Sequence, residues 1–414
     1  MKVLMLTWEF PPRTVGGLAR HVAGLSQALG QEGWEVEVIT PGEAKNDSGR
    51  PRGGVSFHPV QPYALPSLNF ITDIQHLNYS LLEEAVRLIN GGEDIALLHA
   101  HDWLVAFAAR ALKHIYRLPL VCTIHATEYG RNQGLHSELQ HYISSVEWWL
   151  TYESWRVIVC SQSMKDEVGF IFQTPADKMR VIPNAIELSE FTFDPQKAPS
   201  RQNFALPEEK IVFYIGRMVP EKGVQTLLQA VPGILREVPE AKFILAGKGP
   251  YEEELKRMSR EMGLEHKVQF IGYIEDTVRN ALYNYAELAV FPSLYEPFGI
   301  VALEGMATKT PVVVSDTGGL REIVKHEKNG LLFPPGDGNA LARQIIRLLK
   351  ESGLAKRLAE NAYHNVLRDY TWSGVAQKTL GVYQEILEES GKSQWQPYFV
   401  NKINANDVLG RYDY

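Results

Sequence analysis

Short apolar runs alternate with helical stretches along most of the chain. The first half contains the runs KVLMLTW, EVEVITP, DIALLHAHDW, LPLVCTIHA, RVIVCSQS and MRVIPNAI, and helical segments separate most of them. Short strands that alternate with helices indicate βαβ units and a parallel sheet covered on both faces. The pattern therefore predicts a doubly wound, Rossmann-like α/β domain in the first half.

The alternation is interrupted once and then begins again. Around residues 191–208 the chain becomes polar and contains prolines, which is typical of a linker. The runs KIVFYIGRMVPEKG, AKFILAGKG, KVQFIGYI, LAVFPS and TPVVVSDTGG follow, and they predict a second doubly wound domain. We expect domains at residues 1–198 and 199–375 that face each other across a cleft. Residues 376–414 are expected to form a C-terminal helix that packs back on the N-terminal domain, followed by an irregular tail.

Size and composition indicate a globular protein with two hydrophobic cores. The chain has 414 residues, of which 45% are apolar and 22% charged. Its formal net charge of −7 excludes a general nucleic-acid binder, because such a protein needs a basic face. Cys122 and Cys160 lie in apolar runs, which indicates buried free thiols in a reducing cytosol. No apolar run approaches about 18 residues and no signal peptide is evident, so we expect a cytoplasmic protein without a membrane span.

Two glycine-containing loops lie where a doubly wound sheet binds ligands, outside the carboxyl ends of its strands. The segment GRMVPEKG places Arg217 and Lys222 after the first strand of the second half, and two cations beside two glycines suit a diphosphate. A solvated basic loop is the alternative interpretation. The segment VGGLARHV places Gly16 and Gly17 before a helix, where bare backbone can approach a phosphate or a sugar. A tight turn explains these glycines equally well.

Histidines follow two strands of the first half. His99 and His101 occur in LLHAHDW, and His125 occurs in CTIHATE. A single histidine at such a place is more often structural than catalytic, but strand ends of one sheet that converge on one site favour a functional role. The chain contains no Cys/His spacing of the kind that predicts a metal site.

The segment FPSLYEPFGIVALEGMA carries two glutamates in an otherwise apolar stretch. We expect a strand, a turn at LYEP and a helix at FGIVALEGMA. Glu296 then precedes the helix, where the amides of Phe298, Gly299 and Ile300 can donate to an anion. Glu304 lies at most about 12 Å further along, and a buried glutamate there requires a polar ligand or neighbour.

Several of these segments together resemble a known family. EPFGIVALE, with its Glu-x7-Glu spacing, GRMVPEKG, VVVSDTGGLREIV and NGLLFPPGD resemble the nucleotide-sugar-binding domain of the retaining glycosyltransferases of family 4. TWEFPPRTVGGLARHV, HAHDW and TIHATEYG resemble the glycogen and starch synthase-like branch, which builds α-1,4-glucans. The resemblance extends from residue 1 to about residue 385 and implies the two-domain GT-B fold. One departure is that starch synthases usually show a lysine in KTGG, whereas this chain reads RTVGG, with Arg13 one position further out.

The resemblance implies a role for each matching residue. Arg217 and Lys222 would hold the donor diphosphate, with Gly16 and Gly17 approaching the phosphate from the first domain. His101 and His125 would contact the hexose or the reacting centre, and Glu304 would accept hydrogen bonds from the ribose hydroxyls. The donor hexose would be held by Glu296 and by the amides of Phe298, Gly299 and Ile300. The base would lie near Tyr273 and Ile274. Of these residues we expect His125, Arg217, Lys222 and Glu296 to be catalytic.

The resemblance also implies the reaction. The chain contains no Asp-x-Asp, the usual metal-holding pair of the other large glycosyltransferase fold, so we expect neither a metal nor another cofactor. We expect glucose to pass from ADP-glucose or UDP-glucose to an α-1,4-glucan, with retention of configuration. The base of the donor and the exact acceptor stay open at this point.

Three alternatives compete with this function. The acceptor could be a lipid or another small molecule of the cell envelope, for which the basic residues of RALKHIYR, interpreted as a solvated helix face, are the candidates. The protein could be a sugar-nucleotide epimerase of similar fold, or a non-enzymatic sugar-nucleotide-binding protein. In HSELQHYISSVEWWLTYESW the aromatic residues recur at helical spacing, so we expect most of Trp148, Trp149, Tyr152 and Trp155 to pack in the core.

Overall fold

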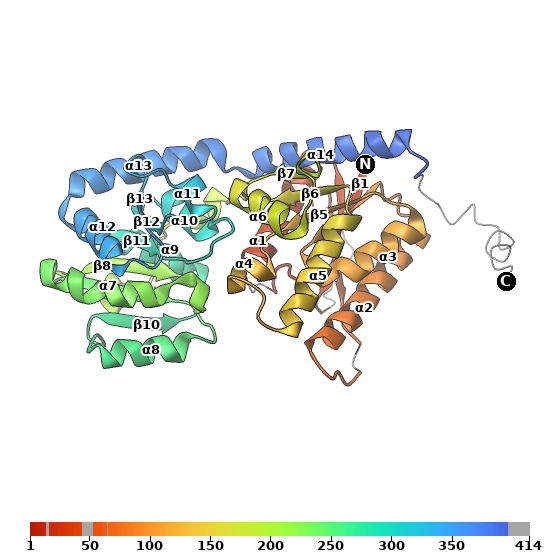
Figure 1. Cartoon of the computed structure of the whole chain (residues 1–414). Helices are drawn as coiled ribbons and strands as arrows, with labels where there is room; N and C mark the ends of the chain where they lie inside the picture. The colour runs from red at the N-terminus through yellow and green to blue at the C-terminus, as the bar shows by residue number, and fades with distance from the viewer. Residues whose placement is uncertain (14–15, 44–52, 64, 396–414) are drawn as a thin grey trace, which may run out of the picture. The chain divides into compact units, whose positions relative to one another are not determined.

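The computed structural model describes residues 1–13, 16–43, 53–63 and 65–395, and the described chain forms two compact units. Unit 1 comprises the described residues within 1–160, 165–182 and 372–395, and unit 2 comprises residues 161–164 and 183–371. Each unit contains one all-parallel sheet with helices on both sides (Figure 1). The predicted fold class, two doubly wound α/β domains, is confirmed.

Unit 1 is built on a seven-stranded sheet of order β3-β2-β1-β4-β5-β6-β7. Its strands are β1 (Lys2–Leu6), β2 (Glu35–Pro41), β3 (Val55–Val60), β4 (Leu97–His101), β5 (Leu120–Ile124), β6 (Arg156–Val159) and β7 (Met179–Val181). The central strands β4 and β5 are buried at every position. Strands covered on both faces are continuous apolar runs, and this is why β4 and β5 could be predicted from the sequence.

Helices cover both faces of this sheet. They are α1 (Gly17–Gln31), α2 (Phe70–Asn90), α3 (Ala106–Tyr116), α4 (Glu128–Asn132), α5 (Glu138–Glu153), α6 (Gln162–Phe172) and α14 (Trp372–Lys392), the first turn of α6 being grouped with unit 2. Helix α3 packs against α2 and α5, and α1 packs against α14. Gly24 permits the second contact, because a Cβ atom there would come within 2.2 Å of the Trp372 ring. Residues 396–414, the expected irregular tail, lie outside the described residues.

Unit 2 contains a six-stranded sheet of order β10-β9-β8-β11-β12-β13. Its strands are β8 (Lys210–Ile215), β9 (Ala241–Ala246), β10 (Val268–Gly272), β11 (Leu288–Phe291), β12 (Val312–Ser315) and β13 (Leu331–Phe333). Its helices are α7 (Val224–Glu237), α8 (Glu252–Glu261), α9 (Asp276–Tyr285), α10 (Ile300–Ala307), α11 (Leu320–Ile323), α12 (Gly338–Lys350) and α13 (Ser352–Asp369). Helices α7, α8 and α12 share one apolar core with the sheet.

The apolar pattern did not indicate two of the strands, β3 and β13. Both lie at an edge of their sheet. Strand β3 contains Pro59, which an edge position tolerates because its missing N–H is not needed for a ladder hydrogen bond. Strand β13 has three residues and no room for a periodic signal.

The chain passes between the units at residues 182 and 183 and again at residues 371 and 372. The polar segment around residues 191–208 belongs to unit 2, where the Phe193 ring packs on Tyr285 and the Tyr285 hydroxyl donates to the Pro199 carbonyl at 3.0 Å. Its polar, proline-rich composition reflects an irregular but packed surface segment.

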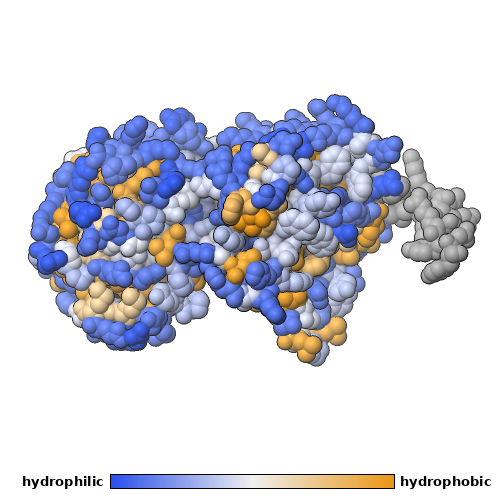
Figure 2. Space-filling view, in the orientation of Figure 1, coloured by the Kyte–Doolittle hydropathy of each residue, from blue (hydrophilic) through white to orange (hydrophobic). Residues whose placement is uncertain are grey.

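The surface of both units is mostly hydrophilic on the face drawn in Figure 2, with apolar surface at the end of unit 1 where α2 begins. Leu65 and Leu68, just before α2, are exposed there. Cys122 and Cys160 are buried and free, as predicted, and burial raises the pKa of Cys122 to about 12. None of the helices in the described part of the chain is both long and apolar enough to cross a membrane.

The aromatic residues around α5 correct one expectation, because they do not pack in the core. Trp148 and Tyr152 are 45% and 68% exposed, and Trp149 and Trp155 are only partly buried. Helix α5 instead turns its aliphatic face inward, with Ile143, Val146 and Leu150 among its buried residues. An interval of four residues places Trp148 and Tyr152 on the same side of the helix, but it does not determine whether that side is buried.

Three of the four basic residues of RALKHIYR form a cluster around one glutamate. Arg110, Lys113 and His114 on α3 lie 3.0, 2.8 and 3.0 Å from the carboxylate of Glu153 on α5. Burial alone would raise the pKa of Glu153, but the hydrogen bonds from Lys113, His114 and Arg110 outweigh it and lower that pKa to about 2. These charges therefore hold α3 against α5, whereas the sequence suggested a solvated helix face.

Candidate active site

Three loops of unit 2 meet at the carboxyl ends of adjacent strands. They follow β8, β11 and β12, which are neighbours in the sheet. Gly223 ends the first loop at φ +70°, and a Cβ atom there would lie 1.9 Å from the Pro292 carbonyl oxygen of the second. Gly318, in the third loop at φ +47°, stands in the same relation to the Glu296 carbonyl oxygen, at 2.0 Å. Only glycine allows backbones to approach this closely, so these residues hold the three loops together.

The loops bring Lys222 and Glu296 into a salt bridge. The Lys222 ammonium lies 2.6 Å from Glu296 Oε2, and the Ser293 hydroxyl donates to the same oxygen at 3.1 Å. Both side chains are largely buried, at 19% and 9% exposed. An ion pair removed from water requires both of its charges, because either one alone would be strongly destabilising. Two residues predicted separately, one for the diphosphate and one for the sugar, are therefore coupled.

Arg217 lies in the loop after β8 but outside this pair. Its side chain is 51% exposed and contacts Glu221 at 3.6 Å. The Tyr214 hydroxyl donates to the Arg217 carbonyl at 3.2 Å and fixes the loop backbone. A guanidinium that keeps half of its surface in water can move onto an anionic ligand at a small desolvation cost.

Glu304 is buried on α10, and the polar neighbour it requires is Tyr283. The Tyr283 hydroxyl donates to Glu304 Oε2 and to the Val301 carbonyl, at 3.2 Å each. Tyr283 lies on α9, far from Glu304 in sequence, and no local pattern indicated it. This contact also agrees with a purely structural role for Glu304, as a buried carboxylate that is hydrogen-bonded within the protein.

The helix that carries Glu304 begins two residues later than the sequence suggested. Helix α10 starts at Ile300, and Gly299 precedes it with φ +109°. Phe298 is buried, and its ring lies 6.1 Å from that of Tyr370. In the first turn of α10 the Ala302 amide donates to the Gly299 carbonyl at 3.0 Å, and the anion site at the amides of Phe298, Gly299 and Ile300 stays a prediction. Tyr273 and Ile274 follow β10 at the sheet edge, and the Tyr273 side chain is 73% exposed.

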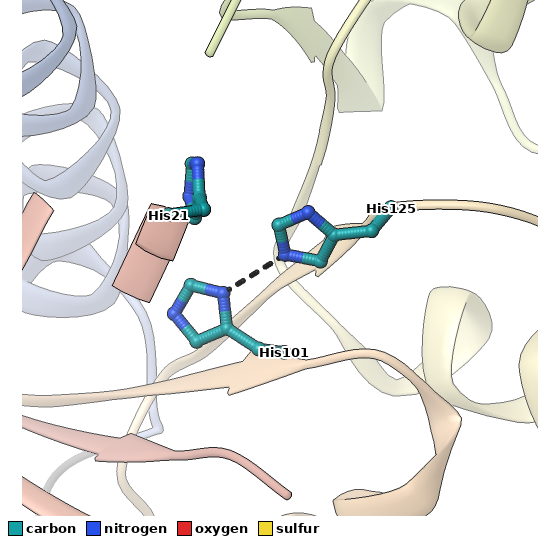
Figure 3. A group of neighbouring side chains, drawn as sticks. All are labelled: His21, His101 and His125. Carbon is teal, nitrogen blue, oxygen red and sulfur yellow. Dashed lines mark hydrogen bonds between the residues drawn. The ribbon is translucent and has the colours of Figure 1, made fainter. Parts of the chain in front are cut away.

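In unit 1, His101 is the last residue of β4 and His125 directly follows the adjacent strand β5 (Figure 3), whereas His99, expected after the strand, lies within β4. His101 Nδ1 and His125 Nε2 are 3.2 Å apart. The ring of His21, from α1, lies 5.6 Å from His101 and 4.7 Å from His125 between centroids. His21 was not predicted, although it stands four residues after Gly17, one helical turn into α1. That interval is the signal that could have identified it.

Burial favours the neutral form of the His101 and His125 imidazoles. It lowers the pKa of His125 to about 3, with a smaller contribution from Arg131, and holds the pKa of His101 well below its ordinary value. The His125 backbone amide donates to Asp102 Oδ1 at 2.8 Å, and burial raises the pKa of Asp102 to about 6. Asp102 adopts φ +62°, an unusual conformation for a non-glycine residue that this bond helps to hold. His125 thus presents a neutral ring from a fixed backbone.

His99 has a structural role. Its two ring nitrogens lie 2.7 Å from the Tyr383 hydroxyl and 2.7 Å from the Thr123 hydroxyl. Both nitrogens are therefore engaged inside the unit, and the histidine connects β4 with α14 and β5.

Gly16 and Gly17 begin α1. The Gly16 amide donates to Glu9 Oε2 at 3.0 Å, so a carboxylate of the chain lies where a phosphate was expected. Among the described residues, leaving aside its chain neighbours, no atom lies within 4 Å of a Cβ placed on Gly16. The Arg13 guanidinium lies 4.6 Å from the Trp8 ring centroid, and this cation–π contact does not place it at the glycines.

Comparison with known proteins agrees with this architecture. Residues 15–190 match the domain described as glycosyltransferase family 4, and residues 196–365 match the domain described as glycosyl transferases group 1. An uncharacterized glycosyltransferase of Methanocaldococcus jannaschii is 40% identical over 95% of this chain and 100% of its own length. The chain belongs to the group 1 and family 4 glycosyltransferases.

Other relatives of this glycosyltransferase include synthases. A glycogen synthase of Mycobacterium tuberculosis is 34% identical over 96% of this chain and 97% of its own length. The structure of sucrose-phosphate synthase from Thermosynechococcus elongatus has a TM-score of 0.80, at 26% identity, over 94% of this chain and 100% of that one. The glycosyltransferase therefore has the GT-B fold, as the sequence predicted. The group 1 match lies within unit 2, which carries the Lys222–Glu296 pair.

Proposed function

We propose that this glycosyltransferase transfers glucose from ADP-glucose or UDP-glucose to an α-1,4-glucan with retention of configuration. The observation that carries the donor half of the proposal is the buried Lys222–Glu296 pair, held among three glycine-bearing loops. Lys222 and Arg217 stabilise the charge that grows on the departing diphosphate. Glu296 and the amides of Phe298, Gly299 and Ile300 hold the hexose, and Glu304 accepts hydrogen bonds from the ribose hydroxyls.

In the proposed reaction the bond between C1 of glucose and the diphosphate oxygen breaks, and a bond from C1 to the acceptor O4 forms on the same face. The proton of the acceptor hydroxyl passes to the departing phosphate. His101 and His125 contact the hexose or the reacting centre, and Gly16 and Gly17 approach the phosphate. The nucleobase lies against Tyr273 and Ile274. No metal takes part, because lysine, arginine and helix amides supply the positive potential.

Two observations support a glucan as acceptor. The chain is 34% identical to a glycogen synthase over nearly its full length. On α5 of unit 1 the rings of Trp148 and Tyr152 stack at 5.6 Å with an interplanar angle of 22°, and both are exposed. Exposed aromatic faces can stack on glucose rings. An envelope lipid as acceptor is less favoured, since Arg110, Lys113 and His114 are paired with Glu153.

The test is a grid of donors and acceptors. ADP-glucose and UDP-glucose, each labelled in the glucose, are incubated with maltotetraose, with a lipid extract, or without acceptor. We expect a ladder of longer oligosaccharides with one donor, degraded by an α-1,4-specific glucosidase. Label in the lipid extract without a ladder would overturn the glucan assignment. A changed sugar nucleotide in the reaction without acceptor would indicate an epimerase.

A further inference from the structure

Unit 1 gathers three histidines from three separate segments at one point. His21 comes from α1, His101 from the end of β4 and His125 from the loop after β5. One ring nitrogen of each lies within 4.8 Å of a nitrogen of both others. Figure 3 shows the rings of His101 and His125 facing each other, with that of His21 beside them. No other group of three or more histidine, cysteine or acidic side chains in the described chain meets this criterion.

The spacing of the nitrogens suits a metal ion. Two histidine nitrogens about 2.0–2.1 Å from a tetrahedral Zn²⁺ lie about 3.4 Å apart. His101 Nδ1 and His125 Nε2 are 3.2 Å apart, so they need to separate only slightly to bind one ion. The His21 ring stands edge-on to His125, at 72°, which leaves room for a third ligand next to the pair.

A hydrogen bond between two neutral imidazoles has the same length, so the distance alone does not decide. His101 Nε2 is buried and has no hydrogen-bond partner among the described residues, a cost that a purely structural cluster would carry permanently. A bound ion supplies the missing partner when the His101 ring turns so that Nε2 points at the ion. His99, whose nitrogens are held by Tyr383 and Thr123, lies 4.1 Å from His101 between centroids and supports its ring from behind.

We propose that His21, His101 and His125 bind one divalent cation of the zinc class. Three imidazoles favour Zn²⁺, Ni²⁺, Co²⁺ or Cu²⁺ over Mg²⁺ and Ca²⁺, which prefer oxygen ligands. Three protein ligands leave a fourth position for water. The bound cation also withdraws His125 from the sugar and inhibits transfer, and this second statement rests on the proposed function.

Binding needs no net release of protons from the histidines. A neutral imidazole carries one proton and one nitrogen lone pair, so His101 can bind through Nε2 and His125 through Nε2 while each ring keeps its proton on Nδ1. Each ligating nitrogen then offers a lone pair to the cation. The ion gains three ligands in exchange for water, and nothing is oxidised or reduced.

The test uses the full chain without a histidine tag, freed of metal with a chelator that is then removed. Co²⁺ is titrated in while the visible absorption bands of tetrahedral cobalt are recorded, and Zn²⁺ is added to displace it. We expect one equivalent of Co²⁺ to bind and one equivalent of Zn²⁺ to abolish the bands. His21→Gln should weaken binding at least tenfold, whereas the control His364→Gln, an exposed histidine on α13, should bind as the wild type does.

The wild-type titration decides the binding claim whether or not a variant folds. Absence of the cobalt bands, or identical bands and affinity in a folded His21→Gln protein, would overturn it. Transfer is then measured with Zn²⁺ and after addition of a chelator. We expect loss of activity that the chelator reverses, and full activity in the zinc-bound protein would overturn the inhibition. If no transfer occurs under any condition, the proposed function fails while the binding result stands.

Discussion

At the scale of single residues, the candidate site depends on charges that are buried in pairs. Lys222 and Glu296 are held 2.6 Å apart with little exposure to water, and Ser293 donates to the same carboxylate oxygen. Removing one member of such a pair costs about 3–5 kcal/mol, because the remaining charge stays buried without compensation. A test of the role of Lys222 must therefore separate stability from turnover.

We predict that Lys222→Ala lowers turnover by roughly 10²-fold, because the lysine stabilises charge that develops on the leaving diphosphate. The double variant Lys222→Ala/Glu296→Gln should recover much of the lost thermal stability and none of the turnover. Lys256→Ala, which removes a surface ion pair on α8, serves as the control. The measurements are kcat and the melting temperature. A folded Lys222→Ala protein with full turnover would contradict the assignment.

At the scale of elements, the loops at the carboxyl ends of β8, β11 and β12 are positioned by backbone contacts that only glycine permits. Gly223 faces the Pro292 carbonyl oxygen, and Gly318 faces that of Glu296. These contacts fix the loop that carries Lys222 relative to the loop that carries Glu296. Strain in one loop should therefore appear in ligand binding as well as in stability.

Gly223→Ala tests this coupling, and Gly263→Ala is its matched control. Both glycines have positive φ, at +70° and +67°, but nothing lies within 4 Å of a Cβ atom on Gly263. Gly263→Ala should cost about 1–2 kcal/mol, the penalty of a left-handed conformation for alanine. Gly223→Ala should cost clearly more and also weaken nucleotide binding, as measured by chemical unfolding and calorimetry. Equal losses of unfolding free energy in the two variants would show that the close contact between Gly223 and the Pro292 carbonyl oxygen does not affect stability.

The contact between α3 and α5 should make unit 1 sensitive to acid through Glu153. The pKa of Glu153 is lowered to about 2 in the folded chain, below its ordinary value of 4.5. Its contribution is therefore present above pH 4.5 and is lost as the pH falls toward 2. We expect Glu153→Gln to destabilise the protein by about 1–2 kcal/mol at pH 7, allowing for screening of the exposed partners, and by little near pH 2. Unfolding in urea at several pH values measures this.

Glu388→Gln is the control for that experiment, since Glu388 is an exposed glutamate on α14. It should leave the pH dependence of stability as it is in the wild type. If Glu153→Gln lowered the free energy of unfolding by the same amount from pH 7 to pH 2, the packing of the side chain and not its charge would account for the effect.

At the scale of the whole molecule, the protein itself supplies the positive charge that the proposed reaction needs near the diphosphate. Arg217, Lys222 and the first amides of α10 come from unit 2, although the chain as a whole carries a formal net charge of −7. Local cations thus act within an acidic protein, which favours binding of a small anionic donor over that of nucleic acid.

We predict that transfer proceeds without added metal and is not lowered by EDTA, since no step of the proposed mechanism uses a metal ion. Initial rates are measured before and after prolonged dialysis against the chelator. Loss of activity that Mg²⁺ or Mn²⁺ restores would contradict the proposal. An increase in activity on chelation would instead agree with an inhibitory cation at the three histidines.

The sequence by itself determined the two doubly wound sheets and most of the polar residues at their strand ends. Strands buried on both faces are continuous apolar runs, and the next turn or helix begins with glycine or a polar residue, so this information is local. The edge strands β3 and β13 did not follow the rule, because one contains proline and the other is very short.

The tertiary structure alone decided which of those residues meet. Lys222 and Glu296 are 74 positions apart, and they form a pair because β8 and β11 are neighbours in the sheet. His101 and His125 meet because β4 lies beside β5, and His21 joins them through the packing of α1. Tyr283 reaches Glu304 from another helix, and α5 turns Trp148 and Tyr152 outward. Strand order and helix orientation depend on contacts between distant segments, and a pattern read along the chain cannot contain them.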